Sequence, residues 1–406
     1  MKVLVLNSGS SSIKYQLFDM DSLAVLASGM VERIGEAQGH IIHKVRGSGS
    51  EDEKTIRRSL PVADHRQGFE LMGQILSETG AIRHTSELAA MGHRVVHGGE
   101  KFQAPVIITE EVMETIRGLI PLAPLHNPAN LTGIQVAREY APEVRQVAVF
   151  DTAFHQTIPE HAYLYALPRS LYEKLQVRRY GFHGTSHFFV AKEAAVHLGR
   201  DFSDTNLITL HLGNGASIAA IKNGRCVDTS MGMTPLAGLI MGTRCGDLDP
   251  AIIFYLARET GMGLQELDAL LNHDSGLKGI CGDNDMRRIT ECAAQGDVHA
   301  ELALDMFCYR IRKYIGSYLA VLGRVDALVF TGGIGENAAI VREKVCFGLA
   351  ALGMGIAREK NLAATKGLRE LQQDDGPLKV LVIPTNEELE IARQTIDVLL
   401  RRASCD

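Results

Sequence analysis

The segment VLVLNSGSSSIKYQLFD, residues 3–19, decides the fold of this chain. Val3–Leu6 form an apolar run that predicts a buried strand, and in residues 13–19 apolar and polar side chains alternate with the period of a second strand. The small residues Ser8–Ser12 between them predict a tight turn. Such a turn exposes backbone N–H groups and hydroxyls that suit a phosphate group, although a plain hairpin turn fits equally well. The G-x-x-x-x-G-K-[ST] spacing of a P-loop is absent.

A second segment, NLITLHLGNGASIAAIKNGRCVDTS at residues 206–230, repeats the order of strand, small-residue turn and strand. Asn223-Gly224 then marks a hairpin turn before a third strand. The same three-stranded meander is thus used twice, about 200 residues apart, which predicts a duplicated domain. The period alone would fit any β meander. In a duplicated protein, the two small-residue turns are expected to face each other across an interdomain cleft, a common place for ligands.

A third glycine-rich segment is VDALVFTGGIGENAAIVREKV at residues 325–345. It predicts a buried strand at Ala327–Phe330, a loop TGGIGEN and a helix that begins near Asn337. In this order, backbone can approach a nucleotide closely and the helix N-terminus faces negative charge. The G-x-G-x-x-G spacing of a dinucleotide fold is absent, so the pattern indicates phosphate or nucleoside binding in general.

Two further segments have a predicted local structure. HKVRGSGSEDEK, residues 43–54, predicts a solvated loop or hairpin tip. PTNEELEIARQTIDVLLRR, residues 384–402, predicts a C-terminal amphipathic helix that starts with Thr385 and Glu388 as a capping box. Its apolar face is expected to consist of Ile391, Ile396, Leu399 and Leu400.

The composition is that of an ordinary soluble globular protein with room for two domains. Of its 406 residues, 46% are hydrophobic and 22% are charged. The net charge of −6 and the lack of a Lys/Arg stripe argue against nucleic acid as a partner. No apolar run approaches the roughly 18 residues of a membrane helix, so we expect no membrane association and a cytoplasmic location. The seven cysteines, from Cys226 to Cys405, form no C-x-x-C pair and predict reduced, packing thiols.

Eight ordered motifs, spread over essentially the whole chain, resemble the acetate kinase family. They are NSGSSSIK (7–14), GHRVVHGGEKF (92–102), FDTAFHQTIP (150–159), RRYGFHGTSH (178–187), HLGNGAS (211–217), MGTRCGDLDPA (241–251), FTGGIGENAA (330–339) and PTNEE (384–388). The resemblance implies the α/β superfamily of acetate and sugar kinases, chaperones and actin. Its actin-like ATPase fold consists of duplicated ribonuclease H-like domains that close around ATP.

The resemblance also implies a function and a domain organisation. Family members transfer the γ-phosphoryl group of ATP reversibly to acetate, giving acetyl phosphate and ADP, as homodimers with Mg²⁺, for which Mn²⁺ can substitute. We expect direct in-line transfer, with acetate and ATP as the small-molecule partners. The first domain is expected at residues 1–150, with a C-terminal helix at 386–406 packing back on it. Residues 151–385 are expected to form the second domain, which binds the nucleotide and dimerises.

Phosphoryl transfer requires cations, because several negative oxygens must approach an anionic acceptor. Arg94 follows Gly92-His93, and Arg244 lies in a glycine-rich loop. By themselves, both also fit surface arginines or structural pairs with Glu100 and Asp247. The resemblance implies that they hold the acetate carboxylate and the transferring phosphoryl group, which suits the planar fork of a guanidinium.

His183 and His187 form an H-x-x-x-H pair, which on a helix could bind zinc. No third ligand is evident nearby, and Gly184 weakens a helix there. The resemblance implies instead that His183 stabilises the pentacoordinate phosphoryl group, while His187 is expected to pack or to bond locally.

Three oxygen-bearing side chains are implied near the metal. Asp151 ends a strand, where a carboxylate can simply cap a turn, and a sugar kinase would use it as a base. Acetate, with a pKa of about 4 to 5, is already ionised, so the resemblance implies that Asp151 orients an arginine or assists Mg²⁺ through water. Glu387 lies in a first helical turn, where it also suits the helix dipole. The resemblance implies that Glu387, with Asn7, positions Mg²⁺.

The remaining implied residues bind nucleotide or acceptor, although ordinary turn or core roles fit each of them. The nucleotide residues are Lys14, with Ser10 and Ser12 in the first turn, Gly213, Asn214 and Gly215 in the second, Asp285 and Arg287 near adenine and ribose, and Gly333, Ile334 and Asn337 in the adenosine motif. The acceptor's methyl pocket consists of Val96, Leu125, Phe182 and Pro235. Valine at position 96 favours acetate over propionate, but one methylene is worth only about 1 to 3 kcal/mol. The alternatives are therefore a propionate kinase, then a sugar kinase or a non-enzymatic actin-like nucleotide switch.

Overall fold

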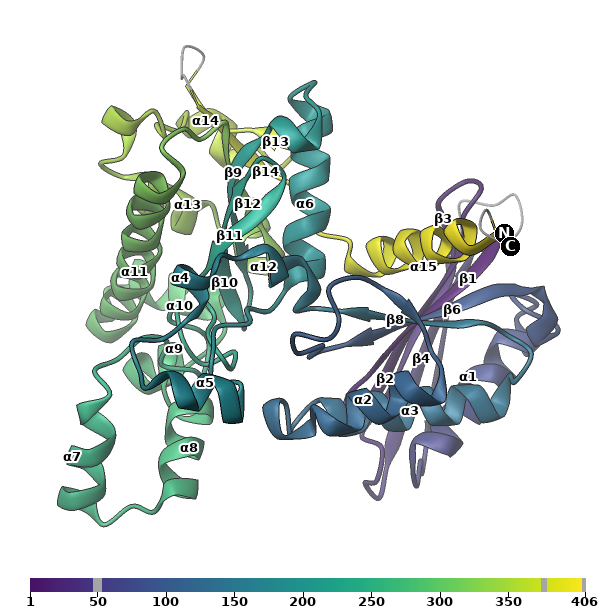
Figure 1. The fold of residues 1–406 in the computed structure, drawn as a ribbon. Helices are drawn as coiled ribbons and strands as arrows, with labels where there is room; N and C mark the ends of the chain where they lie inside the picture. The colour runs from purple at the N-terminus through teal and green to yellow at the C-terminus, as the bar shows by residue number, and fades with distance from the viewer. Residues whose placement is uncertain (47–52, 374–377, 404–406) are drawn as a thin grey trace. The chain divides into compact units, whose positions relative to one another are not determined.

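The computed structural model describes residues 1–46, 53–373 and 378–403 (Figure 1). The chain divides into two compact units, Met1–Ala153 with Asn386–Asp406, and Phe154–Thr385. We refer to them as the first and the second unit. Each is built on a mixed β-sheet with helices packed against it.

The sheet of the first unit has the strand order β5-β4-β3-β2-β1-β6-β8-β7. Its strands are β1 (Lys2–Ser8), β2 (Ser12–Asp19), β3 (Ala24–Glu32), β4 (Gly39–Arg46), β5 (Glu53–Leu60), β6 (Leu88–Val95), β7 (Val106–Ile107) and β8 (Gln146–Phe150). The predicted hairpin at residues 3–19 is confirmed: β1 and β2 pair antiparallel with Ser8 opposite Ile13, and the Gly9 N–H donates to the Ser12 carbonyl at 2.8 Å. β1 is parallel to β6, and β6 is parallel to β8.

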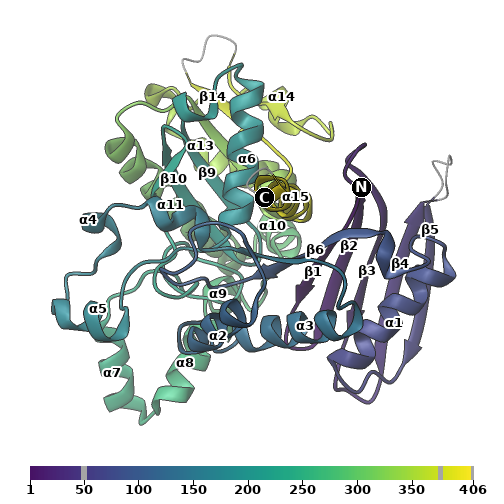
Figure 2. The same cartoon turned by 45° about the vertical axis from the view of Figure 1, so that its right-hand side comes forward.

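Alternation along β1 builds a core on each face of this sheet, because successive side chains point to opposite faces. Leu4 and Leu6 pack into the core beneath α1 (His65–Glu78) and α3 (Asn127–Tyr140), whereas Val3 and Val5 pack against the C-terminal helix α15 (Glu387–Ala403). Figures 1 and 2 show α1 and α3 next to each other on one face. The remaining long helix is α2 (Glu110–Gly118).

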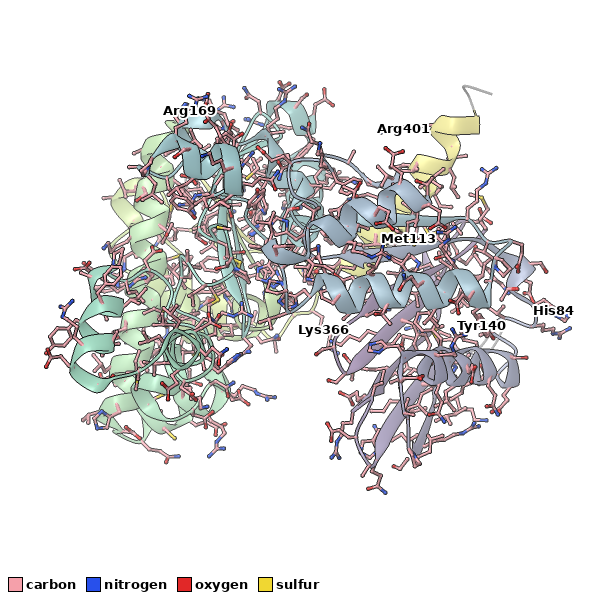
Figure 3. The ribbon with its side chains drawn as sticks, turned by 60° about the horizontal axis from the view of Figure 1, so that its bottom comes forward. His84, Met113, Tyr140, Arg169, Lys366 and Arg401 are labelled. Atoms are coloured by element: carbon pink, nitrogen blue, oxygen red, sulfur yellow. The ribbon has the colours of Figure 1, made fainter. Side chains whose placement is uncertain are left out.

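Tyr140, labelled in Figure 3, ends α3 and covers Gly73 of α1. A Cβ at Gly73 would lie 1.9 Å from the Tyr140 hydroxyl oxygen, so any larger residue would push the ring away. Glycine at this position therefore sets how closely these two helices approach.

The predicted C-terminal helix is confirmed, but the predicted capping box is wrong. The N-cap is Asn386, whose Oδ1 accepts from the Leu389 N–H at 3.0 Å, rather than Thr385 with Glu388. Within the second unit, Thr385 bonds the Ser186 hydroxyl at 2.8 Å and the Glu336 carboxylate at 3.2 Å, so its groups are already engaged. Ile391 and Ile396 are buried as expected, whereas Leu400 is 58% exposed and does not belong to the apolar face. Residues 404–406 lie outside the described residues.

The sheet of the second unit has the order β11-β10-β9-β12-β14-β13. Its strands are β9 (Asn206–Leu212), β10 (Ala216–Lys222), β11 (Arg225–Thr229), β12 (Ala327–Thr331), β13 (Arg369–Glu370) and β14 (Lys379–Val382). The run β3-β2-β1-β6-β8-β7 of the first unit has the same order and the same directions: two antiparallel pairs, two parallel pairs and a final antiparallel pair. The predicted duplication is confirmed.

Eleven helices accompany this sheet in the described part of the second unit. They are α4 (Glu160–Tyr163), α5 (Arg169–Leu175), α6 (Gly184–His197), α7 (Ala251–Thr260), α8 (Leu264–His273), α9 (Gly276–Cys281), α10 (Met286–Ala294), α11 (Val298–Leu322), α12 (Gly332–Asn337), α13 (Ala339–Cys346) and α14 (Arg358–Leu362).

The strand predicted before TGGIGEN is confirmed as β12, but the predicted loop is wrong, because Gly332–Asn337 form the short helix α12. Its glycines disfavour a helix, and contacts at both ends offset this. The Glu336 carboxylate accepts from the Gly332 N–H at 3.0 Å, and the Arg342 guanidinium donates to the Gly335 and Glu336 carbonyls at 2.9 Å.

Within the predicted loop or hairpin tip at 43–54, residues 43–46 end β4 and Glu53 begins β5, and these two strands pair antiparallel. Residues 47–52, which include the tip itself, lie outside the described residues. The six described cysteines are free thiols, and Cys405 lies outside the described part. Where the structure describes the chain, none of its helices is both long and apolar enough to cross a membrane.

Candidate active site

In the first unit, three predicted site residues meet at one edge of the sheet. Asn7 lies in β1, Arg94 in β6, and Asp151 directly after β8. These strands are parallel neighbours, so their carboxyl ends share an edge, where ligands commonly bind. The Arg94 guanidinium forms an ion pair with the Asp151 carboxylate and donates to the Asn7 side-chain oxygen at 3.4 Å. Asp151 is 1% exposed, so its position is fixed by packing, and its ion pair fixes the position of the Arg94 guanidinium.

Glu387, the first residue of α15, adds negative charge to this group. Burial, the largest cause, raises the pKa of Glu387 to about 7. The carboxylates of Asp151 and Glu388 act in the same direction, while Arg94 and Lys14 act against it. For Arg94, burial lowers the pKa, but the nearby carboxylates outweigh it and the pKa is raised. The cluster thus gathers more acids than bases in a partly buried place.

This cluster offers oxygen ligands, as a hard divalent cation prefers. Among the residues that the structure describes, no group of three or more His, Cys, Asp and Glu side chains is arranged to hold a metal by itself. Mg²⁺ usually keeps several waters and takes one or two carboxylates. Burial first, and the neighbouring carboxylates second, raise the pKa of Glu387, so a cation bound there would stabilise its ionised form. Asn7 and Glu387 therefore fit a sparse Mg²⁺ site.

In the second unit, His183 and Arg244 converge on the turn Gly213–Gly215. His183 precedes α6 with a left-handed φ of 58° and stacks on His211 with ring centroids 4.3 Å apart. A Cβ at Gly215 would lie 3.4 Å from His183 Nε2 and 3.7 Å from an Arg244 terminal nitrogen. The side chains of His183 and Arg244 therefore both lie close to Gly215 of this turn.

Arg244 carries a charge that its surroundings leave unneutralised. Its guanidinium donates to the Pro235 carbonyl at 3.2 Å and contacts the Met241 sulfur at 3.7 Å, and no carboxylate of the described chain lies within ion-pair distance. Asp247, the alternative partner, binds Arg310 and Tyr314 instead. Burial lowers the pKa of Arg244. An anion bound here would supply the missing counter-charge.

The predicted nucleotide residues of the second unit line a cavity of about 940 Å³. Gly213, Asn214, Asp285, Arg287, Gly333, Ile334 and Asn337 all line it. Asp285 caps α10 and holds the Arg287 guanidinium at 2.6 Å; this hydrogen bond lowers the pKa of Asp285 to about 2. Gly215 does not line the cavity and faces His183 instead.

The cavity also has wall residues that sequence reasoning missed. They include Asn284, Thr290, Glu291 and Ile340. Asn284 bonds the Asn214 side-chain oxygen at 3.3 Å and so links α10 to the glycine turn. The only sequence signal was their position next to residues of the recognised motifs.

The predicted acceptor residues are divided between the units. Val96 is 6% exposed and follows β6, two residues after Arg94, whereas Leu125 is 66% exposed in the segment before α3. In the second unit, Phe182 is buried, and the Pro235 carbonyl accepts a hydrogen bond from Arg244. A shared methyl pocket for the four stays a prediction. Lys14, in β2, lines a different cavity of the first unit together with Asn7.

Sequence reasoning also missed the residues behind His183. His183 Nδ1 and His187 Nε2 both bond the Ser217 hydroxyl, at 2.9 and 2.8 Å, and His187 Nδ1 bonds the Thr209 hydroxyl at 2.7 Å. His187 is fully buried, and burial, with lesser contributions from His155 and His211, holds its pKa well below the usual value. The expected local bonding of His187 is thus present, and both rings share the Ser217 hydroxyl.

Comparison with known proteins places this geometry in a family. The model of the Acetokinase family matches residues 2–393. An acetate kinase of Syntrophobacter fumaroxidans is 56% identical over 408 residues, which cover 99% of this chain and 98% of that protein. The crystal structure of Porphyromonas gingivalis acetate kinase has a TM-score of 0.93 at 44% identity, covering 98% of this chain and 99% of that one. A propionate kinase from Francisella tularensis has a TM-score of 0.90 at 42% identity, covering 97% and 98%. The chain belongs to the acetokinase family.

Proposed function

We propose that this protein transfers the γ-phosphoryl group of ATP reversibly to acetate, giving acetyl phosphate and ADP. The observation that carries the proposal is Arg244, a partly buried guanidinium without a carboxylate partner in the described chain, which faces His183 and a glycine turn. Arg94 of the first unit supplies a second guanidinium, two residues before the buried Val96. Guanidinium groups suit the binding of both a carboxylate and a phosphate.

The chemistry requires no general base. Acetate is ionised at neutral pH, so one carboxylate oxygen attacks the γ-phosphorus in line while the bond to the β–γ bridging oxygen breaks and ADP leaves. No proton moves. Asp151 is paired with Arg94 and therefore orients a cation rather than accepting a proton. His183, through Nε2, and Arg244 stabilise the negative equatorial oxygens of the phosphoryl group in flight.

We propose that ATP binds with its adenosine in the cavity of about 940 Å³ and its phosphates along the turn Gly213–Gly215. Asp285 and Arg287, near ribose and adenine, would form the cavity's polar wall, and α12 would carry the opposite wall through Gly333 and Asn337. The cavity is large enough for a nucleoside, since ligand pockets typically measure about 300 to 1,000 Å³. Lys14 of the first unit would contact the phosphates.

Asn7 and Glu387 would hold Mg²⁺ through oxygen and water. When bound, the ion neutralises phosphate charge and orients the terminal phosphate, and Mn²⁺ is expected to substitute. The proposed reaction requires the residues of both units to act on the same pair of substrates and to keep water from competing with acetate for the phosphoryl group. We place this reaction in the cytoplasm, where ATP is available.

We further propose that the protein is a homodimer formed by the second unit. Exposed apolar side chains form a stripe on α11 at Val298, Leu302, Met306 and Tyr309. The spacing of three and four residues places them on one helix face. Phe254 and Tyr255 of α7 are 64% and 57% exposed as well. Apolar groupings of this kind mark interaction surfaces.

Trapping the product acid by acid tests the function. With MgATP and hydroxylamine, acyl phosphates convert to hydroxamates, and we expect efficient product formation with acetate and a lower kcat/KM with propionate. A reversed preference would identify a propionate kinase, which the Francisella tularensis relative makes the second candidate. ATP turnover only with a sugar, or no carboxylate-dependent turnover, would reject the proposal.

A further inference from the structure

A line of three hydrogen bonds runs behind His183 across two strands and a helix. Thr209 of β9 bonds His187 Nδ1 at 2.7 Å, His187 Nε2 of α6 bonds Ser217 Oγ at 2.8 Å, and Ser217 of β10 bonds His183 Nδ1 at 2.9 Å. Thr209, His187 and Ser217 are all fully buried. Water therefore cannot replace a missing partner, and each donor in the line must find its acceptor within it.

Counting donors fixes the direction of the line. The Thr209 hydroxyl contacts His187 and no second hydrogen-bond partner in the part of the chain that the structure describes. Its single proton is satisfied only if it points at His187 Nδ1. A neutral imidazole carries one proton, so His187 then donates from Nε2 to Ser217, and Ser217 donates to His183 Nδ1. The opposite direction would leave the Thr209 O–H buried without an acceptor, which is unfavourable.

We propose that Thr209, His187 and Ser217 act as positioning residues that hold His183 in the tautomer with its proton on Nε2. His183 Nε2 faces Gly215 and the Arg244 guanidinium. The inference rests on the proposed function, in which the neutral Nε2–H donates to a phosphoryl oxygen. Nδ1 accepts the serine proton, so protonation of Nδ1 would require Ser217 to give up this hydrogen bond.

The groups that face His183 reinforce this state. His211 of β9 stacks on the His183 ring with an angle of 28° between the planes, and a terminal nitrogen of Arg244 lies near the same face of Gly215 as His183 Nε2. His187 of α6 lies on the other side of the Ser217 hydroxyl, and its ring centroid is 5.8 Å from that of His155. A second positive charge on His183 would meet Arg244 and would require the whole line to reverse. We therefore expect His183 to stay neutral in the metal-free, nucleotide-free protein at pH 7.

Nitrogen-15 NMR of histidine-labelled full-length protein tests the tautomer without relying on activity. Long-range ¹H–¹⁵N spectra at pH 7 should show His183 with an unprotonated Nδ1 and a protonated Nε2. Ser217→Ala removes the donor to Nδ1, so the titration midpoint of His183 should move upward by about one pH unit. Thr209→Ser keeps a hydroxyl and should retain the wild-type spectrum.

Thr229→Val is the matched control, since Thr229 is also fully buried in a strand but its hydroxyl donates to the Ile218 carbonyl. It should leave the midpoint unchanged. In turnover assays, Ser217→Ala should lower kcat about tenfold with little change in the KM for ATP, and Thr229→Val should not. A proton on His183 Nδ1 in the wild-type protein, or equal midpoints in wild type and Ser217→Ala, would overturn the inference even if acetate kinase activity is present. The expected spectra without such activity would instead reject only the proposed function.

Discussion

At the scale of single residues, the unneutralised charge of Arg244 is the feature most open to test. Arg244→Ala removes a cation from the transferring phosphoryl group, and we expect kcat to fall by about 10²- to 10³-fold. Lysine keeps the charge but not the planar fork, so Arg244→Lys should recover only part of the rate. Steady-state kinetics of acetyl phosphate formation measures both.

The control for this variant is Arg200→Ala, because Arg200 is half exposed and pairs with Asp326 at the surface. Its rate should equal that of the wild type. Circular dichroism and ADP affinity should show that Arg244→Ala remains folded and binds nucleotide. Near-normal turnover of Arg244→Ala would reject the assigned role.

The raised pKa of Glu387 predicts a pH-dependent stability in the absence of metal. An unfolded glutamate ionises near 4.5, while Glu387 retains its proton up to about 7 in the folded protein. Its contribution to stability is therefore complete below pH 4.5 and is lost as the pH rises through 7. Glu387→Gln cannot ionise, so relative to this variant the wild type should lose about 1 to 2 kcal/mol between pH 4.5 and pH 8, after allowance for partial solvent exposure.

Urea unfolding with EDTA at several pH values measures this difference. Glu111→Gln, which changes an exposed glutamate of α2, should follow the wild type at every pH. Adding Mg²⁺ at pH 8 should raise the melting temperature of the wild type and not that of Glu387→Gln. Parallel pH profiles of the wild type and Glu387→Gln would show that Glu387 is not buried among like charges.

The motifs that carry the site residues could be found in the sequence, but the buried residues that hydrogen-bond to those side chains could not. Arg94, His183 and Arg244 stand in recognisable motifs. Ser217 and Thr209 are small polar residues of ordinary strands, and only the register of β9 against β10, which sets Ser217 opposite His211, brings them to the histidines. Register depends on pairing across the sheet, which a single strand's pattern does not specify.

At the scale of elements, α12 shows how contacts from side chains outside a helix override the preference of the helix's own residues. The glycines of GGIGEN predicted a loop, yet the buried Arg342 clamps the end of this helix and also donates to the Asn361 side chain at 2.7 Å and to its carbonyl at 3.0 Å. Arg342 is 1% exposed, and burial lowers its pKa to about 10. Nothing near GGIGEN in the sequence signalled that this arginine would bind it.

Arg342→Met should therefore loosen α12 while keeping a side chain of similar length. The carbonyls of Gly335 and Asn361 would lose this donor in a buried place, whereas the Glu336 carbonyl would keep its hydrogen bond from Arg369 at 2.7 Å. We expect the second unit to lose about 2 to 4 kcal/mol of stability. Because α12 carries Gly333 and Asn337, the affinity for ADP should fall by roughly tenfold. Urea denaturation and isothermal titration calorimetry measure the two effects. Arg358→Met, an exposed arginine of α14, should change neither; unaltered stability of Arg342→Met would contradict the clamp.

At the scale of the whole molecule, the duplication was predictable because each half begins with the same meander. The three antiparallel strands are local in sequence, so hairpin signals sufficed for them. The parallel strands β6, β8, β12 and β14 join each sheet through long connections, and no pattern in the sequence predicted their order. In both sheets the corresponding strand carries site residues at its carboxyl end: Asn7 in β1, and the turn Gly213–Gly215 after β9.

The stripe on α11 makes a prediction about assembly. Leu302 and Tyr309 are 50% and 60% exposed on one helix face, an arrangement that is unfavourable in water unless another surface covers it. If a second copy of the chain covers it, Leu302→Glu with Tyr309→Glu places two like charges on each side of a two-fold interface and should convert the dimer to a monomer. Leu175→Glu, an equally exposed leucine of α5, should leave the mass unchanged. Sedimentation equilibrium should give the mass of two chains for the wild type and the control, and of one chain for the double variant. A double variant that remains dimeric would place the interface elsewhere, whereas a monomeric wild type would show that no stable dimer forms.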